Sequence, residues 1–292
     1  MRALLIINPK AGRRKNSPIP DIQDVFRKQE EFELEIHETT CQGCATKAAR
    51  KAAKEGCELV IAAGGDGSIF EVSNGLVGSE TALGVIPVGT ENVLAREMGV
   101  PLVPRKAAEF MLRQPPRVID TGRVGDQHFV CFAGIGFDAH VAHRLPGERK
   151  KRFGALAYIL TSAEKIRPYH AVPRHLKLTL DGDTVEMDFW IMVISNIRSY
   201  GGRLIPAPEA IVDDGLLDVC VFPKANYLEL MRQMAAMKSG KHTSLPGVRY
   251  FQAARIEVET DQPEELQLDG DAWPGKPPFL VEAVPRSLTV RF

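Results

Sequence analysis

Three glycine-containing turns hold the residues whose types and spacing could bind a phosphate group. Each follows a short apolar run, and the turns are Asn8-Pro9-Lys10-Ala11-Gly12, Gly64-Gly65-Asp66-Gly67-Ser68 and Gly89-Thr90-Glu91-Asn92. Glycine turns expose backbone N–H groups, and a helix that begins directly after a turn adds positive partial charge. Ser68, Thr90 and Asn92 contribute hydroxyl and amide groups that could bind phosphate or ribose. We therefore expect a nucleotide at these turns.

Asp66 has two interpretations. Aspartate is a favoured helix N-cap and Asp-Gly is a common turn, so the residue could serve local structure alone. A carboxylate beside a phosphate site is repelled unless a cation lies between them, so the functional interpretation is a phosphate contact made through Mg²⁺. The presence of three such turns favours the functional interpretation.

The apolar runs at residues 4–7, 59–63 and 82–88 are rich in Leu, Ile and Val without alternation. Such runs predict parallel strands that are covered on both faces. Helical spacing predicts helices around residues 45–53, 69–76 and 90–98. Repeated strand–helix–strand units predict a doubly wound α/β domain, in which ligands bind outside the carboxyl ends of the strands. All three turns should therefore lie along one edge of the sheet, which Thr39, just before the first of these helices, could also reach.

The sequence changes character at about residue 117. Short strand-like segments follow at 127–132, 174–181, 184–194, 215–222, 254–260, 265–268 and 278–284, separated by turn dipeptides such as Asp181-Gly182. Closely spaced strands of this kind predict an antiparallel β-sandwich or barrel-like domain. We expect an α/β domain over residues 1–122, a β-rich domain over 123–285, and residues 286–292 as candidates to return to the first domain.

Composition excludes several classes of protein. The chain has 292 residues and a formal net charge of zero, so bulk electrostatics does not attract it to nucleic acid. No window approaches the roughly 20 apolar residues of a membrane span. The five cysteines are odd in number and scattered, which favours a reducing cytoplasm over a disulfide framework. Cys41 and Cys44 have CxxC spacing, and an unremarkable pair at a helix start is favoured over a redox or zinc site.

An ordered set of motifs resembles the diacylglycerol kinase catalytic domain family, and within it the soluble bacterial lipid kinases. The motifs are NPKAG, GGDGSIFEVSNGL, PVGTENVLAR, GIGFDA and DDGLLDV, and the resemblance extends to the closing VPRSLTVRF. The Gly-Gly-Asp-Gly turn alone is shared with NAD kinases and phosphofructokinases, whereas the full set is specific. The resemblance implies an NAD kinase-like α/β fold with ATP bound at Asn8 to Gly12, Thr39, Gly65 to Glu71, and Thr90.

The resemblance also implies roles in the second domain, which would be a lipid-binding β-sandwich. A Mg²⁺ site would use the Asp214 carboxylate and the backbone carbonyls of Ile211 and Leu216, although Asp213-Asp214-Gly215 alone indicates only a hairpin turn. The catalytic base matches Asp271, which stands where the family commonly has Glu. Asp269 is the alternative base, and the plain interpretation of both is a turn.

Two departures from the family's pattern leave alternatives open. Phe70 replaces the usual Asn, and Val93 replaces the usual Asp, so an amide and a carboxylate near the nucleotide are missing. The favoured function is ATP- and Mg²⁺-dependent phosphorylation of a lipid hydroxyl. The alternatives are a kinase of a soluble substrate such as NAD, and a non-catalytic nucleotide-binding regulatory protein.

A basic cluster bears on the partner. Arg149, Lys150, Lys151 and Arg152 could dock transiently on anionic lipid headgroups, or form a solvated loop. We expect a cytoplasmic protein with transient membrane contact. The sequence leaves open which lipid is phosphorylated and whether the protein forms a homodimer.

Overall fold

The computed structural model describes residues 1–9, 17–29, 31–144, 174–201, 204–224 and 227–292. The expected roles of Lys10, Ala11 and Gly12, and of the basic cluster at 149–152, lie outside these residues. The chain forms two compact units, one of Met1–Asp120 with Arg286–Phe292, the other of Thr121–Pro285. Among the described residues no helix is long and apolar enough to span a bilayer.

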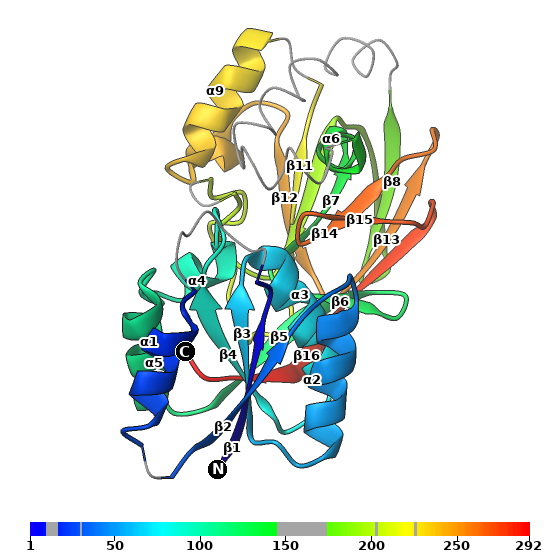
Figure 1. The fold of residues 1–292 in the computed structure, drawn as a ribbon. Helices are drawn as coiled ribbons and strands as arrows, with labels where there is room; N and C mark the ends of the chain where they lie inside the picture. Colours follow the sequence, from blue (N-terminus) through cyan, green and yellow to red (C-terminus); the bar gives the residue numbers. More distant parts are fainter. Residues whose placement is uncertain (10–16, 30, 145–173, 202–203, 225–226) are drawn as a thin grey trace. The chain divides into compact units, whose positions relative to one another are not determined.

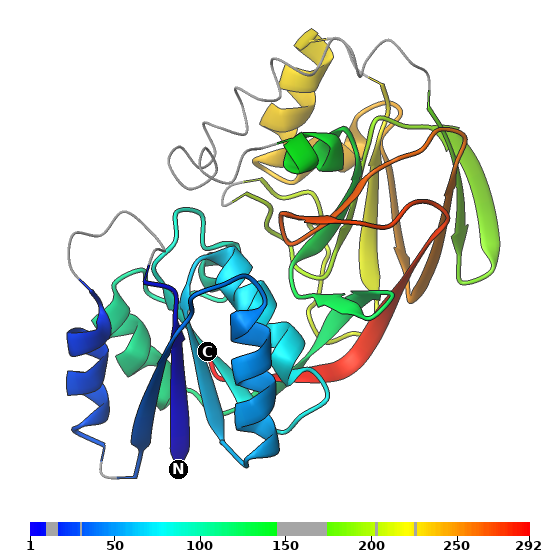
Figure 2. The ribbon, with the colours of Figure 1, turned by 45° about the vertical axis from the view of Figure 1, so that its right-hand side comes forward.

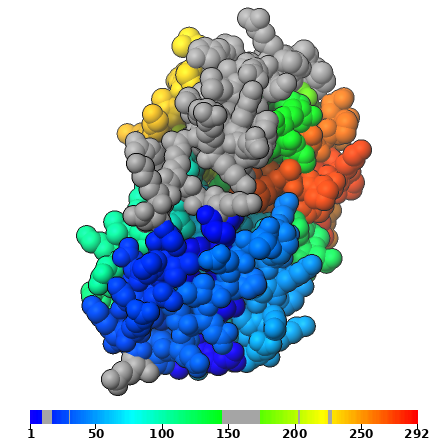
Figure 3. Space-filling view, viewed as in Figure 1, coloured from blue at the N-terminus to red at the C-terminus, as the bar shows by residue number. Residues whose placement is uncertain are grey.

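The first unit is a parallel sheet with helices on both faces. Its strands lie in the order β2 (Glu33–Glu38), β1 (Arg2–Ile7), β3 (Leu59–Gly64), β4 (Ala82–Pro87) and the end of β16 (Phe279–Val290). In Figures 1 and 2, α1 (Ile19–Phe26) and α5 (Pro104–Arg113) cover one face, and α2 (Cys44–Lys54) and α3 (Asp66–Leu76) cover the other. The N-terminal part of the chain, drawn in blue in the space-filling view of Figure 3, forms much of this unit's surface in that view.

The continuous apolar runs explain this sheet. Every residue of β3 and of β4 is buried, as expected for strands covered on both faces. The edge strand β2 alternates between exposed and half-buried residues instead. The helix expected at 90–98 is shorter, α4 (Val93–Glu97), because Asn92 has a left-handed backbone (φ 50°), so the regular helix begins only after it.

The second unit contains antiparallel strands in two sheets. One sheet has the order β12 (Arg249–Ala253), β11 (Leu217–Phe222), β10 (Ile191–Ser195), β7 (Phe132–Gly136), β14 (Leu266–Leu268) and β15 (Asp271–Trp273). In the other, β16 pairs with β13 (Arg255–Thr260), which pairs with β8 (His175–Leu180), which pairs with β9 (Asp183–Asp188). The hairpin of β5 (Arg117–Val124) and β6 (Gln127–Phe129), the helices α6 (Phe137–Arg144) and α9 (Tyr227–Met237), and the short 3₁₀ helix η1 (Lys241–Ser244) complete the described elements.

The predicted fold class, a doubly wound α/β part and an antiparallel β part, is confirmed. The single strand expected over 184–194 is wrong, because it divides into β9 in one sheet and β10 in the other. Phe189 and Trp190, at the break, are both buried, and consecutive buried side chains do not fit a strand with one solvated face. The chain therefore changes sheets at this dipeptide.

The last seven residues belong to the first unit. Arg286 N donates to the Asp120 carboxylate at 2.7 Å, and the Ser287 carbonyl accepts from Gly78 N at 2.9 Å. Val290 pairs with Leu83 of β4, and the Arg291 guanidinium donates to the carbonyls of Leu112 and Gln114 at the end of α5. These contacts place the end of β16 beside β4.

Candidate functional site

Two of the glycine turns lie directly against each other at the carboxyl ends of β3 and β4. A Cβ atom on Gly89 would lie 2.5 Å from the Cα of Gly65 and 2.9 Å from Asn92 Oδ1. The Gly64 carbonyl accepts from Val88 N at 3.0 Å and from Gly89 N at 3.3 Å. Only glycine allows this close approach of two backbones. The glycines thus have a reason that the sequence analysis did not give, which is contact between the two turns.

Asp66 fastens the third turn to the second. Its carboxylate accepts hydrogen bonds from Val93 N at 2.7 Å and from Asn92 N at 3.1 Å, so it caps α4 rather than its own helix. Burial raises the pKa of Asp66, and hydrogen bonds from the backbone N–H groups of Val93, Asn92 and Asp66 itself oppose that shift. The local role of Asp66 is therefore to position a neighbouring turn, and a direct contact with Mg²⁺ stays a prediction.

Asn92 closes its own turn. Its Oδ1 accepts from Gly89 N at 3.0 Å, its Nδ2 donates to the Gly89 carbonyl at 2.9 Å, and the residue is buried. Val93 is also buried, so the position of the family's missing carboxylate is an apolar site here. Thr90, by contrast, is exposed at the tip of the turn. Of the two polar side chains expected to reach a ligand from this turn, Thr90 is the better placed.

The start of α3 has the features of an anion site. Gly65 is the extended residue before the helix, and no side chain caps its first N–H groups. Ser68 lies over Gly64, since a Cβ there would meet its hydroxyl at 2.3 Å. N–H groups at a helix start bind phosphate readily, and of those in the first turn here, the N–H of Ser68 already donates to the Gly65 carbonyl at 2.9 Å. The carbonyl of Phe70 accepts from Ser73 Oγ and Asn74 Nδ2, both at 2.9 Å, further along the helix.

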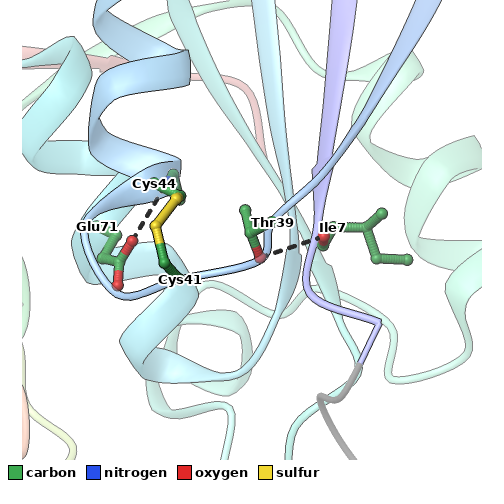
Figure 4. The surroundings of a disulfide bond; sticks show 6 residues. Ile7, Thr39, Cys41, Cys44 and Glu71 are labelled. Carbon is green, nitrogen blue, oxygen red and sulfur yellow. Dashed lines mark hydrogen bonds between the residues drawn. A yellow bond between two sulfur atoms is a disulfide. The ribbon is translucent and has the colours of Figure 1, made fainter.

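Thr39 and Glu71 lie on either side of the turn that begins α2 (Figure 4). Thr39 donates to the Ile7 carbonyl at the end of β1 through its backbone N–H at 2.9 Å and its hydroxyl at 3.4 Å. Glu71 accepts from Ala45 N at 3.1 Å. Between them, Cys41 and Cys44 form a disulfide bond, so the expectation of an unremarkable reduced pair is not what the structure describes.

In the second unit, the structure separates the two candidate bases. Asp269 is 7% exposed, and its carboxylate accepts from the backbone N–H groups of Val130, Cys131 and Phe132, each at 2.9 Å. A carboxylate held by three backbone donors is a structural anchor for its turn. Asp271 begins β15 two residues later and is half-buried. Of the two alternatives, Asp271 is therefore the better candidate to act on a substrate.

A buried polar network below this turn was missed by the sequence analysis. Asp138 of α6 accepts from Gln267 Nε2 at 2.9 Å and from the Tyr200 hydroxyl. Gln267 Oε1 in turn accepts from Gly270 N at 2.6 Å, inside the turn between Asp269 and Asp271. The signal was present, because Asp138 is an acid within an otherwise apolar motif that follows a strand. Its partners could not be read from sequence, since they come from distant segments.

The expected metal residues lie in an exposed turn. Asp214 and Ile211 are exposed, and Asp214 Oδ1 accepts from Leu216 N at 3.0 Å. No cluster of three or more His, Cys, Asp or Glu side chains that could hold a metal occurs among the described residues. A cation here would therefore rely on one carboxylate, backbone carbonyls and water, a donor set that Mg²⁺ accepts. The assignment stays a prediction.

Two family models match the chain. The diacylglycerol kinase catalytic domain matches residues 2–124, and the YegS C-terminal NAD kinase beta sandwich-like domain matches residues 132–292. The chain is 35% identical to a diacylglycerol kinase of Bacillus subtilis (strain 168), over 92% of this chain and 89% of that one. It is 31% identical to a probable lipid kinase YegS-like of Chromohalobacter salexigens, over 88% and 84%.

A solved structure agrees along the whole chain. The crystal structure of a diacylglycerol kinase from Bacillus anthracis str. Sterne matches with a TM-score of 0.75 at 25% identity, covering 100% of this chain and 96% of that one. The resemblance that the ordered motifs indicated is confirmed. The chain belongs to the diacylglycerol kinase catalytic domain family, among its bacterial lipid kinases.

Proposed function

We propose that this lipid kinase transfers the γ-phosphoryl group of ATP to a hydroxyl group of a diacylglycerol-like lipid. The observation that carries the proposal is the pair of glycine turns packed backbone to backbone and fastened by Asp66 at the ends of β3 and β4. Two relatives of the chain are named as lipid kinases, and membership in their family implies ATP as the phosphate donor.

The proposed ATP site lies at the carboxyl edge of the parallel sheet. Its phosphates would meet the N–H groups at the start of α3, with Ser68 and Thr90 as hydroxyl donors. The remaining proposed contacts are Asn8, Pro9, Lys10, Ala11, Gly12, Thr39, Gly64, Gly65, Asp66, Gly67, Glu71, Gly89 and Asn92. Asp66 would serve by holding the two turns in register, and by organising the phosphates with a Mg²⁺ ion.

Asp271 is the proposed general base. A lipid hydroxyl does not ionise near neutral pH, so a positioned carboxylate must accept its proton while the oxygen attacks the γ-phosphorus and ADP leaves. The turn that carries Asp271 is held on one side by Asp269 and on the other by Gln267. Such rigid support is what a catalytic group requires.

We further propose that Mg²⁺ neutralises negative charge on the phosphates, with a separate structural ion at Asp214 and the carbonyls of Ile211 and Leu216. The enzyme would work in the cytoplasm. Because the acceptor is a membrane lipid, it would contact the bilayer transiently. Arg149 to Arg152 are the proposed contact, on the grounds of their charge alone. A homodimer is compatible with this proposal but is not required by it.

The test is phosphate transfer from labelled ATP, with Mg²⁺, to vesicles that contain diacylglycerol, phosphatidylglycerol or a sphingoid base. Asp271→Asn should lower the transfer rate by about 10²- to 10⁴-fold, because it removes the base, and should leave folding intact. Asp126→Asn, in an exposed turn of the same unit, is the matched control and should retain activity.

Asp269→Asn separates the anchor from the base. It should destabilise the second unit, because it weakens the acceptor of three backbone N–H groups, and so lower activity through folding. Full activity of Asp271→Asn, or no transfer to any lipid of the panel, would contradict the proposal. Formation of NADP from NAD and ATP would support the soluble-substrate alternative instead.

A further inference from the structure

The Cys41–Cys44 disulfide is the one cysteine feature of the chain that is accessible to a reagent. Cys41 is exposed and Cys44 half-buried, whereas Cys57, Cys131 and Cys220 are buried and form no disulfide. Burial raises the pKa of the thiols of Cys57 and Cys220, which keeps them protonated and unreactive. Thiol–disulfide exchange on the folded protein should therefore be confined to the exposed pair.

The position of the pair in the fold favours exchange. Cys44 is the first residue of α2, a helix of 11 residues, and the Gly43 N-cap provides no side-chain cap. The positive end of a helix stabilises a thiolate in its first turn. Cys44 is therefore a good leaving group when the disulfide is attacked at the more exposed sulfur, that of Cys41.

The turn closed by the disulfide is joined to two loops of the proposed ATP site. Upstream, Thr39 is hydrogen-bonded to Ile7, which is followed by Asn8. Downstream, Ala45 N donates to Glu71 Oε2 at 3.1 Å and Thr46 Oγ1 donates to the Glu71 carbonyl at 2.8 Å, which binds the start of α2 to α3. In Figure 4 the disulfide lies between these two sets of contacts.

We propose that Cys41 and Cys44 form a reversible redox-modification site that controls ATP affinity, an inference that rests on the proposed function. The disulfide closes the short turn and keeps Thr39 and the first turn of α2 in fixed positions. The reduced turn has more conformational freedom, which ATP binding must then remove. The oxidised protein is therefore the tighter binder.

The exchange needs a dithiol reductant as co-reactant. A thiolate of the dithiol attacks Cys41 Sγ, the bond between the two cysteine sulfurs breaks, and Cys44 leaves as a thiolate. The second thiolate of the reagent then attacks the reagent's first sulfur, which is bonded to Cys41 in the mixed disulfide, and releases the Cys41 thiolate. Two electrons pass to the protein, both cysteine thiolates take up protons, and the dithiol ends as a disulfide.

The experiment compares the oxidised full-length protein with protein treated with dithiothreitol. Alkylation and mass mapping should show modification of Cys41 and Cys44 only after reduction, with the three buried cysteines unmodified in both states. Calorimetric titration with ATP and Mg²⁺ should give a dissociation constant about three- to tenfold higher after reduction. Cys57→Ser is the matched control and should keep this response.

The double variant Cys41→Ser, Cys44→Ser should bind ATP with the affinity of the reduced protein, and dithiothreitol should not change that affinity. Equal ATP affinity in both redox states, or a response that persists in the double variant, would overturn the proposal and leave the proposed kinase function standing. Failure of both states to bind ATP would contradict the ATP site, and the coupling with it. Alkylation of the buried cysteines as well would contradict the claim that exchange is confined to Cys41 and Cys44, and would overturn the proposal.

Discussion

At the scale of single residues, Asp66 shows how one carboxylate can serve two structural levels. It occupies the first helical position of α3, yet its oxygens bind the backbone of the next turn. The sequence offered a local cap or a phosphate contact as alternatives. Asp66 does cap a helix, but that helix is α4, in a turn that is adjacent to its own only because β3 and β4 are neighbours.

Asp66→Asn should therefore loosen the Gly89–Asn92 turn. The amide can accept from one backbone N–H, but its NH₂ group would face the other, and an unsatisfied buried donor costs about 1–3 kcal/mol. We expect lower stability in urea unfolding followed by circular dichroism, together with weaker ATP binding. Glu91→Gln removes a charge from the same turn and is the control. If the two variants are equally stable, Asp66 does not hold the turn.

At the scale of elements, the close packing of α2 on α3 is the contact that positions the disulfide turn. Gly75 of α3 lies so near α2 that an added Cβ would come within 2.6 Å of the Thr46 carbonyl oxygen and 2.7 Å of Ala49 Cβ. The alanine stripe of α2 makes this approach feasible, since Ala45, Ala49 and Ala52 are its buried residues.

Gly75→Ala should force the two helices apart. Although alanine favours a helix, the clash with backbone atoms should outweigh that gain and destabilise the first unit by about 1–3 kcal/mol. Thermal unfolding followed by circular dichroism measures this. Asn74→Ala, at the adjacent position, provides the comparison and should cost less. A more stable Gly75→Ala protein would show that the helices can move without penalty.

Elements with a single repeating pattern were predictable from sequence. The unbroken apolar runs of β3 and β4 and the alanine spacing of α2 indicate both type and position. Features that depend on partners distant in sequence were not. In the sequence, Asp269 looks like the acid of any Asp-Gly turn. It becomes an anchor only because the backbone segment Val130–Phe132 folds against its carboxylate. Phe189-Trp190 likewise reads as strand, and the change of sheet appears only in three dimensions.

At the scale of the whole molecule, three histidines of the second unit make its stability depend on pH. Burial lowers the pKa of His128, His140 and His242. The unfolded chain therefore binds more protons than the folded chain as the pH falls below the ordinary histidine value of about 6.5. The hydrogen bond to Asp188 raises the pKa of the exposed His175, which is a shift in the opposite direction.

We expect the second unit to lose stability on acidification from about pH 7.5 to about pH 5.5. Both tryptophans, Trp190 and Trp273, lie in this unit, so their fluorescence during urea unfolding reports on it selectively. His242→Gln should reduce the slope of stability against pH, even if it lowers stability overall. Stability that is constant or higher at the acid end would contradict the role assigned to the buried histidines.

The course of β16 has a consequence for biosynthesis. Most of the first unit leaves the ribosome before any of the second, but the neighbour of β4 is supplied by Val290, near the end of the chain. The second unit is therefore translated between β4 and the strand that completes the sheet beside it. During that interval β4 presents an uncovered strand edge, the kind of surface on which chains associate wrongly. Of the two units, the one whose synthesis begins earlier is thus the one whose fold is completed later.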